Sequence, residues 1–227
     1  MSRSLKFDFA GPDWRLGRSP EDEPLAPPNL DLVAEQSWRK VFSELPRPLE
    51  LVVEIGFGRG EFLMDLATES PDTAHLGVEY SRKRVLKMAR RLAKTEVRNI
   101  RLLEARGEDV VERLLQPNTV RRFWINFSDP WPKARHHRRR LVQPKLVAGI
   151  AESLVPGGDL EVATDHPEYA EAIHEVLSKE SGLENVNAPL PYLAEVPGRR
   201  HTAYELEWRA EGRDLHFFSY RKPAGAR

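Results

Sequence analysis

Cysteine is absent from this chain of 227 residues. That absence excludes disulfide bonds, thiolate zinc sites, iron–sulfur clusters and cysteine nucleophiles. Long apolar runs are also missing, because no stretch approaches the roughly 18–20 residues that a membrane helix needs. The first residues lack the apolar core of a signal peptide, so the sequence favours a cytoplasmic protein. The chain also has no formal net charge, because 35 Lys and Arg balance 35 Asp and Glu. This balance excludes a nucleic-acid-binding protein that is basic over its whole surface.

The length suits one large domain preceded by an arm. Residues 1–30 are rich in proline and carry the acidic run Glu21–Glu23, so we expect an extended, partly disordered arm there. Residues 31–227 are expected to form a single domain. Apolar residues between Leu32 and Phe42 recur at helical spacing, which predicts one short amphipathic helix. Both a monomer and a homodimer are compatible with the sequence.

Strand-like and helix-like segments alternate from residue 50 onward. Short apolar runs predict five strands, and the segments between them have helical character. This alternation is typical of an α/β fold with a doubly wound, mostly parallel sheet. The predicted strands are 51–55, 74–78, 100–103, 122–127 and 160–164, and the predicted helices are 60–69, 81–94, 108–115, 144–154 and 168–179.

The C-terminal segment allows two interpretations. Apolar residues alternate with polar ones over 214–220, which predicts an antiparallel C-terminal strand. Residues 203–209 alternate in the same way and favour a second strand. However, Thr202 and Glu205 have the spacing of a helical capping box. The sequence therefore leaves strand and helix open for residues 203–209.

Gly56, Gly58 and Gly60 follow the first predicted strand. Glycine permits positive φ and lets a ligand approach the backbone closely. The third glycine comes one residue too early for the dinucleotide spacing G-x-G-x-x-G, which disfavours a nicotinamide cofactor. Glu79 ends the second predicted strand about 20 residues later, where a carboxylate can accept hydrogen bonds from ribose hydroxyls. The combination predicts a nucleoside-containing cofactor, against the alternative of a plain strand-to-helix turn.

Glu54 stands just before the glycines and narrows the choice of cofactor. A carboxylate at this place suits a cationic group and repels a pyrophosphate. S-adenosylmethionine carries a sulfonium and an α-ammonium group, and the whole pattern resembles the Rossmann-like class I S-adenosylmethionine-dependent methyltransferases. That resemblance implies that Glu108, at the start of a helix, contacts the adenine. The alternative for Glu108 is a carboxylate favoured there by the helix dipole alone.

The run Asn126–Lys133, which reads NFSDPWPK, follows the fourth predicted strand. Ligands of open parallel sheets bind beyond the carboxyl ends of the strands, which places Asp129 beside the glycine turn of the neighbouring strand. Pro130 and Pro132 fix two φ angles and hold Asp129 and Trp131 stiffly, as a transfer reaction requires. The alternative is a stiff loop in which Trp131 only plugs the core.

Residues 133–140 contain five Lys or Arg, two His and no acidic residue. This basic run is explained either as a solvated surface or as a phosphate-binding loop beside the transfer site. Its adjacent histidines have no nearby carboxylate or cysteine to complete a ligand set, so no metal site is predicted. Residues 82–101 hold nine more Lys or Arg and one Glu. Zero net charge is therefore an average over opposed surfaces.

The run Asn126–Leu141 closely resembles the signature of the tRNA (guanine-N7-)-methyltransferases, which usually reads N-F-P-D-P-W-P-K with a basic tail. Two further family motifs are matched, T-D-x-x-x-Y by Thr164–Tyr169 and T-x-Y-E by Thr202–Glu205. The resemblance covers about residues 28–222. It implies a Rossmann-like class I methyltransferase that acts on N7 of a tRNA guanine, at position 46 of the variable loop, with tRNA as its partner.

The motifs and the resemblance assign expected roles to individual residues. Those expected to hold the cofactor are Glu54, Gly56, Gly58, Glu79, Glu108 and Asp129, and Asp129 is also the expected catalytic residue. Those expected to bind the substrate nucleotide are Lys133, Asp165, Thr202 and Glu205. RNA phosphates are expected to contact Arg135, Arg138, Arg139 and Arg140. Three positions depart from the family pattern, since Ser128 replaces Pro, Ala134 replaces a frequent Lys and Glu108 replaces a common Asp.

Guanine N7 has a lone pair and no proton, so no general base is needed, and we expect catalysis by placement and electrostatics. Three alternatives stay open. One is a methyltransferase for an exocyclic amine or a protein amide, whose loop has two prolines before the aromatic residue. Another is a nicotinamide oxidoreductase, which the glycine spacing opposes. The third is a non-catalytic RNA-binding module, which the retained carboxylates oppose.

Overall fold

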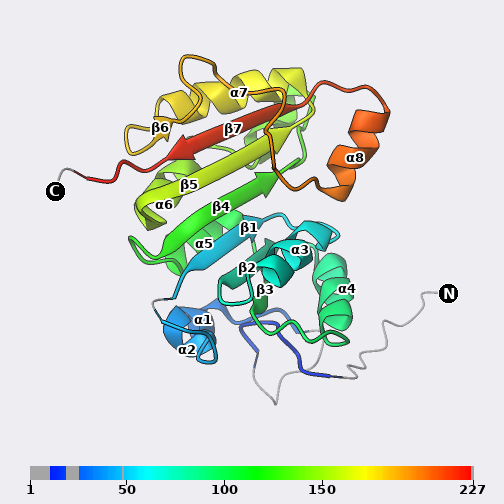
Figure 1. Ribbon diagram of the computed structural model, residues 1–227, viewed down its shortest axis with the longest axis vertical. Coiled ribbons are helices and arrows are strands. Elements are labelled where there is room, and N and C mark those ends of the chain that lie inside the picture. The colour runs from blue at the N-terminus through cyan, green and yellow to red at the C-terminus, as the bar shows by residue number, and fades with distance from the viewer. Residues whose placement is uncertain (1–10, 19–25, 48, 226–227) are drawn as a thin grey trace.

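The computed structural model describes residues 11–18, 26–47 and 49–225. A seven-stranded sheet runs through the molecule in the order β3-β2-β1-β4-β5-β7-β6 (Figure 1). All pairs from β3 across to β5 are parallel, and β7 is antiparallel to β5 and to β6. This confirms the predicted α/β fold with an antiparallel C-terminal strand. The strands are β1 Leu51–Ile55, β2 Ala74–Glu79, β3 Ile100–Glu104, β4 Val120–Asn126, β5 Leu154–Thr164, β6 Glu184–Asn185 and β7 His216–Arg221.

The central strands form because their apolar runs are buried on both faces of the sheet. Val53, Leu76 and Phe123 from three adjacent strands have no exposed surface. Burying a side chain of this size contributes about 1.5–3 kcal/mol to folding. The strand order reverses between β1 and β4, and a sheet of this kind binds ligands beyond the carboxyl ends of its strands at such a reversal.

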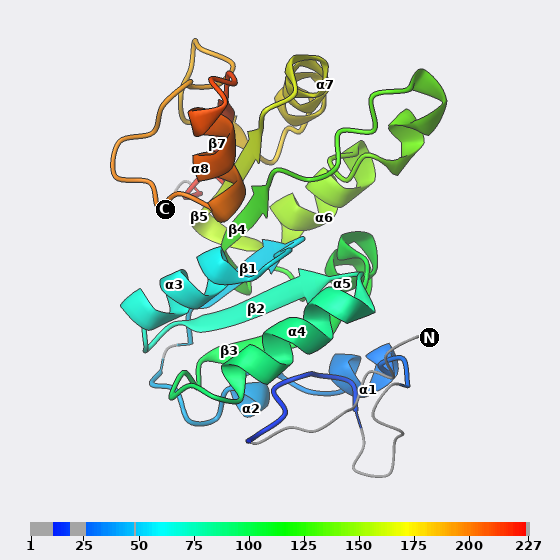
Figure 2. The ribbon, with the colours of Figure 1, turned by 90° about the vertical axis from the view of Figure 1, so that its right-hand side faces the viewer.

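Helices cover both faces of the sheet. On one face α3 and α4 pack on β3 through an apolar cluster that includes Leu63 and Val85. On the other face α5, α6 and α7 contribute Val110, Ile150 and Ile173 to a larger cluster, and Figure 2 shows α3 and α6 on opposite sides of β1 and β4. The helices are α3 Glu61–Glu69, α4 Arg82–Leu92, α5 Gly107–Arg113, α6 Pro144–Ser153 and α7 Pro167–Ser178. In the part of the chain that is described, no helix is long and apolar enough to cross a membrane.

The open choice at residues 203–209 is resolved in favour of a helix, α8 Ala203–Ala210. The capping box decides it, because the Thr202 hydroxyl accepts a hydrogen bond of 3.0 Å from the Glu205 backbone N–H. The prediction of one helix near 32–42 was wrong. Ser37 accepts from the Lys40 backbone N–H and starts a new helix, so the segment divides into α1 Leu30–Ala34 and α2 Trp38–Val41. Two short elements were not predicted, β6 and the 3-10 helix η1 at Ala134–Arg139.

Part of the proline-rich N-terminal arm lies along the outer edge of β3. The Leu16 N–H donates to the Leu102 carbonyl at 2.8 Å, and the Leu102 N–H donates to the Trp14 carbonyl at 3.0 Å. The Trp14 ring packs on the Arg101 guanidinium, whose carbon lies 4.4 Å from the ring centre. Residues 14–16 are therefore extended and tied to the domain. The expected disorder of residues 1–10 and 19–25 lies outside the described residues.

The carboxyl ends of the parallel strands gather the segments that the motifs singled out. Figure 1 shows the arrowheads of β4 and β5 pointing to the side of the molecule where α8 stands. The glycine turn follows β1 and leads into α3, and the run Asn126–Lys133 leaves the end of β4 toward η1. This edge of the sheet is the candidate functional site.

Candidate functional site

The glycine turn after β1 has the backbone geometry that its sequence predicts. Gly56, Gly58 and Gly60 have φ values of 80°, 56° and 77°, in the left-handed region that favours glycine. Gly60 is also packed, since a Cβ there would stand 2.5 Å from the Met88 sulfur. A Cβ on Gly56 would instead meet nothing within 4 Å. The backbone at Gly56 therefore faces open space that a ligand can enter.

Glu79 joins this turn to the end of β2. The side chain is buried, and Oε2 accepts a hydrogen bond of 3.1 Å from the Gly58 backbone N–H. Its other oxygen accepts from the Ser81 backbone N–H at 2.9 Å, and Arg84 Nη1 lies 3.4 Å from Oε2. Two predicted cofactor residues, Gly58 and Glu79, are thus in direct contact. Backbone donors on both sides fix the carboxylate at the mouth of the turn.

Glu54 in β1 is the most unusual carboxylate of the site. Only 2% of its surface is exposed, and Oε1 accepts a hydrogen bond of 3.3 Å from the Asn126 side-chain amide. Oε2 is buried and has no hydrogen-bond partner. Burial raises the pKa of Glu54 to about 7, although the Asn126 hydrogen bond and the Arg199 charge oppose that rise. A buried acceptor without a partner is costly, and a cationic donor from a ligand would satisfy it.

The loop after β4 is held by strained backbone at two residues. Phe127 has φ 53° and Trp131 has φ 44°, which is costly for non-glycine residues and concentrates at functional sites. The Phe127 ring packs edge-on against Trp208 of α8 at 4.8 Å between ring centres. Asp129 lies between the two strained residues and is exposed. Sequence reasoning attributed the stiffness to two prolines and missed these positive φ angles.

The basic run divides into an anchor and an exposed face. Arg140 is 5% exposed, and its Nε donates to the Pro130 carbonyl at 2.8 Å while Nη2 donates to Glu168 at 3.0 Å. Its guanidinium also lies 5.1 Å from the centre of the Tyr169 ring. In this structure Arg140 holds the loop, so the phosphate contact expected of it requires that these hydrogen bonds open or are shared. The exposed basic residues of the run are Lys133, Arg135, Arg138 and Arg139.

Replacement of Arg140 by methionine is expected to destabilise the fold by about 1–3 kcal/mol, because the charge-assisted hydrogen bonds from the buried guanidinium to the Pro130 carbonyl and to Glu168 are lost. Thermal unfolding measures the loss, and limited proteolysis between Lys133 and Arg139 should become faster. Arg138→Met is the matched control, since Arg138 is exposed in the 3-10 helix that ends just before Arg140. Equal melting temperatures for the two variants would contradict the anchoring role.

The expected substrate residues at the ends of β5 and α8 are engaged in ion pairs. Asp165 is half-buried and accepts from Arg213 Nη1 at 2.7 Å. Glu205 has no exposed surface; its Oε2 accepts from Arg199, and its Oε1 accepts from Arg209 Nε at 3.1 Å. The Thr202 hydroxyl is used as the cap of α8. Guanine recognition by either carboxylate therefore requires that these ion pairs open or are shared.

Arg199 is the residue that sequence reasoning missed. It stands in an irregular loop next to Arg200, and no periodicity or motif distinguishes the two. In the structure it joins Glu205 to Asn126, and Asn126 in turn contacts Glu54. The expected cofactor and substrate carboxylates are thus linked by contacts. Glu108, in contrast, lies half-buried in the first turn of α5, and no side-chain contact brings it to the other site residues among those described.

Metal-ligating side chains do not cluster within the described ranges, residues 11–18, 26–47 and 49–225. No group of three or more His, Cys, Asp or Glu residues there is arranged to hold an ion. The polar atoms of the site instead include carboxylates, one amide and guanidinium groups, gathered where the parallel strands β1, β2, β4 and β5 end. This donor set suits a cationic ligand that contains hydroxyl groups.

Comparisons with known proteins agree with this geometry. Residues 49–218 match the family described as "Putative methyltransferase". Among solved structures the 16S rRNA methyltransferase KamB is similar at TM-score 0.56 and 16% identity, with 92% of this chain and 98% of that chain covered. The antibiotic-resistance methyltransferase Kmr is similar at TM-score 0.55 and 16% identity, over 84% and 96% of the two chains. At such identities these likenesses concern the fold.

Relatives found by sequence identify the family more specifically than these structural similarities do. A tRNA (guanine-N(7)-)-methyltransferase of Mycolicibacterium paratuberculosis (strain ATCC BAA-968 / K-10) is 37% identical over 91% of this chain and 76% of its own length. One of Geobacter metallireducens (strain ATCC 53774 / DSM 7210 / GS-15) is 34% identical over 86% and 90%. Because these relatives are at least 34% identical over most of this chain and of their own length, and the family model spans residues 49–218, the chain belongs to the tRNA (guanine-N7-)-methyltransferase family.

Proposed function

We propose that this protein transfers a methyl group from S-adenosylmethionine to N7 of a guanine in tRNA and forms 7-methylguanosine. The observation that carries the proposal is the buried Glu54 oxygen without a partner, beside a glycine turn open to a ligand. The relatives that cover most of the chain are named as enzymes of this activity. Position 46 of the variable loop, which the family resemblance implies, is the proposed target.

The residues at the ends of β1 and β2 fit this cofactor. Glu54 Oε2 would accept a hydrogen bond from the α-ammonium group, which gives the buried oxygen the cationic donor it lacks. Glu79 would accept from the ribose hydroxyls at the edge of the glycine turn. The open space at Gly56 lets the cofactor lie against the backbone. Glu108 would contact the adenine from the first turn of α5. When bound, S-adenosylmethionine supplies an electrophilic methyl group on sulfur.

Asp129 is the proposed catalytic residue. Guanine N7 attacks with its own lone pair, so no side chain has to remove a proton, and the purine becomes positively charged as the new bond forms. A carboxylate held beside that ring stabilises the growing charge. The strained residues Phe127 and Trp131 fix the loop on both sides of Asp129 and limit its motion. Trp131 would form one wall for the base.

The guanine would be selected by carboxylates that accept its N1–H and N2–H₂ donors. Asp165 and Glu205 have this chemistry, and adenine offers no matching pair of donors. Their present ion pairs with Arg213, Arg199 and Arg209 occupy both carboxylates, so the base would open or share these pairs. Contacts on this edge of the base require that it leave its stack in the tRNA. Thr202 and Lys133 would hold the sugar and phosphate of the same nucleotide.

The exposed face of η1 would hold the RNA backbone. Neutralising Arg135, Arg138 and Arg139 together to glutamine is expected to weaken tRNA binding at low salt. The slope of log binding constant against log salt should become less negative by about 2–3, because fewer counterions are released. Filter binding at several salt concentrations measures it.

The control for this triple variant neutralises Lys145 and Lys179, which are exposed on α6 and just after α7 and form surface ion pairs. Their loss should leave the slope close to that of the unchanged protein. A triple variant with an unchanged slope would count against η1 as a phosphate-binding segment.

The function is tested by incubating the purified protein with radiolabelled S-adenosylmethionine and tRNA that lacks 7-methylguanosine. We expect label in tRNA, and cleavage at 7-methylguanosine after reduction and aniline treatment should locate it in the variable loop. Ribosomal RNA and a tRNA transcript with adenine at the target position are the controls. Label that appears on another base, or equally in ribosomal RNA, would overturn the proposal.

A further inference from the structure

Arg199 is a buried cation that contacts two different parts of the proposed site. Its side chain is 6% exposed and comes from the loop that precedes α8. Nη1 donates to Glu205 Oε2 of α8, and Nη2 donates to Asn126 Oδ1 of β4 at 2.6 Å. Aromatic rings surround it, with Phe217 4.7 Å and Trp124 5.7 Å from the guanidinium carbon. Arginine is suited to this position, because its planar guanidinium donates in two fixed directions.

The contact with Asn126 fixes which way that amide points. Since Oδ1 accepts from Arg199, Nδ2 is directed at Glu54 and donates to Oε1 at 3.3 Å. The opposite orientation would place a carbonyl oxygen against the carboxylate and an N–H₂ group against a guanidinium. With Oε1 held in this way, Oε2 of Glu54 is the oxygen left for a ligand.

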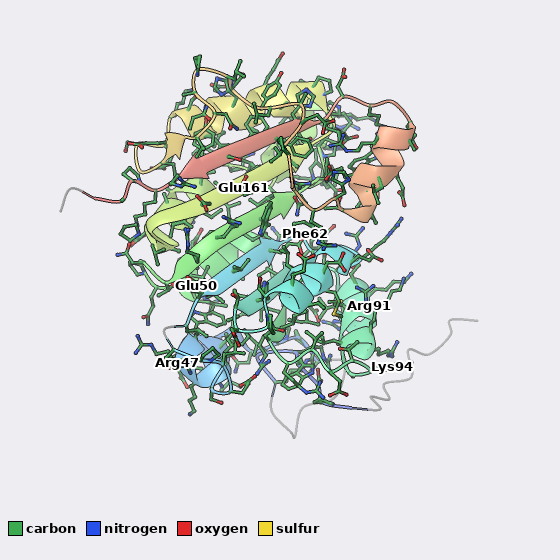
Figure 3. All side chains as sticks on the ribbon, in the orientation of Figure 1. Arg47, Glu50, Phe62, Arg91, Lys94 and Glu161 are labelled. Atoms are coloured by element: carbon green, nitrogen blue, oxygen red, sulfur yellow. The ribbon has the colours of Figure 1, made fainter. Side chains whose placement is uncertain are left out.

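One neutral hydrogen-bond donor and two charged groups act on Glu54, each from a different segment of the chain. Asn126 of β4 donates to it, Arg199 contributes a positive charge, and Glu79 of β2 contributes a negative one. Arg199 in turn is balanced by Glu205, while Glu161 of β5 attracts it and Arg209 repels it. Figure 3 shows Glu161 on β5 and Phe62 on α3, and the Phe62 ring centre lies 5.8 Å from the Arg199 guanidinium carbon. Arg199 therefore helps to keep Glu54 ionised.

We propose that Arg199 is a positioning residue for methyl transfer, which acts through Asn126 to present Glu54 to the cofactor and holds Glu205 for the base. The inference rests on the proposed function, because it assigns Glu54 and Glu205 to the two ligands. It adds a residue outside the sequence motifs that pointed to the site. It also makes the ends of β1, β4 and α8 one connected unit, so a change at Arg199 acts on both ligands.

The test compares Arg199→Met and Arg199→Lys with the matched control Arg200→Met. Arg200 is the next residue and is exposed, with Asp65 3.2 Å away on α3. Calorimetric titration of each full-length protein with S-adenosylmethionine from pH 6 to pH 9 gives affinity against pH. For Arg199→Met we expect about tenfold weaker binding at pH 7 and a midpoint moved to higher pH by about one unit, since a lost positive charge favours protonated Glu54. Arg199→Lys keeps the charge and should move the midpoint less.

Asn126→Leu completes a double-mutant cycle with Arg199→Met. If Arg199 acts through Asn126, adding Asn126→Leu to Arg199→Met should cause little further loss of cofactor affinity. Fully additive losses, or a midpoint in Arg199→Met that matches Arg200→Met, would overturn the inference. If Arg199→Met does not fold, Arg199→Lys in the same cycle carries the test.

Failure of the inference is distinguishable from failure of the proposed function. An unchanged protein that binds S-adenosylmethionine and methylates tRNA, together with Arg199 variants that behave like Arg200→Met, removes the positioning role and leaves the function standing. An unchanged protein that does not bind S-adenosylmethionine contradicts the function itself.

Discussion

Replacing Asp129 with alanine is expected to lower the rate of methyl transfer by about 100-fold or more, while the affinity for S-adenosylmethionine falls only several-fold. The carboxylate is proposed to stabilise charge that develops on the purine in the transition state, and removal of one such preorganised group typically costs about 10²–10³ in rate. Asp129 is exposed, so the substitution should leave the fold intact. Single-turnover rates with saturating cofactor and tRNA measure the chemical step directly.

Two variants sharpen this measurement. Asp129→Asn keeps the shape of the side chain and removes its charge, so it should resemble the alanine variant if charge is what counts. Ser128→Ala is the loop control, because Ser128 contacts the Tyr169 hydroxyl at 3.3 Å and belongs to the same strained turn. Turnover near normal in both Asp129 variants would remove Asp129 from the catalytic role.

Replacing Glu54 with glutamine should abolish measurable binding of S-adenosylmethionine at neutral pH and make the protein more stable at pH 8. Binding is lost because the amide cannot neutralise the α-ammonium group in a buried site. Stability rises because the folded protein no longer contains a buried carboxylate that must ionise. Calorimetric titration measures the first effect, and urea unfolding at pH 5 and pH 8 measures the second.

The direction of the stability effect follows from the pKa of Glu54. Burial raises that pKa from an ordinary 4.5 to about 7, so folding favours the protonated form. The contribution of protonated Glu54 to the free energy of unfolding is fully present below about pH 4.5. It is lost as the pH rises to about 7, and the total loss is about 3 kcal/mol. In the glutamine variant this decline should disappear. Cofactor affinity has the opposite dependence on Glu54, because the cation needs the ionised carboxylate and binds more tightly as the pH rises toward 7.

Glu161→Gln is the control for Glu54→Gln. Glu161 is a half-buried carboxylate of β5 on the same face of the sheet, its pKa is raised by burial, and Ser219 donates to it at 2.5 Å. Its replacement should change the pH dependence of unfolding and leave cofactor affinity nearly unchanged. If both variants lose cofactor binding equally, the assignment of Glu54 to the ammonium group is wrong.

The strands of this fold are readily predicted from sequence because buried parallel strands are short, continuous apolar runs. The glycine turn was also predictable, because backbone with positive φ favours glycine. Gly56 and Gly58 both adopt this backbone conformation. The helix at Ala203–Ala210 was ambiguous, because its apolar residues fit two periods and only the capping residue Thr202 separated them.

What could not be predicted depends on which way individual side chains turn. Arg138 and Arg140 belong to one basic run, and a linear pattern does not reveal that the irregular end of a 3-10 helix turns one of them into the interior. Arg199 and Arg200 are adjacent and identical in type, yet one is buried and the other is exposed. Phe127 and Trp131 have left-handed backbone that their residue types do not suggest. In each case tertiary contacts decide the outcome.

The contact between the N-terminal arm and β3 has a consequence for solubility. A bare edge strand offers a row of free N–H and C=O groups to any other strand and promotes edge-to-edge association. Residues 14–16 occupy part of that edge at Leu102, and Trp14 covers Arg101. At the opposite end of the sheet the outermost strand, β6, has only two residues, too few to serve as a template. Residues 14–16 thereby cover part of one border of the sheet, where unpaired backbone would otherwise promote self-association.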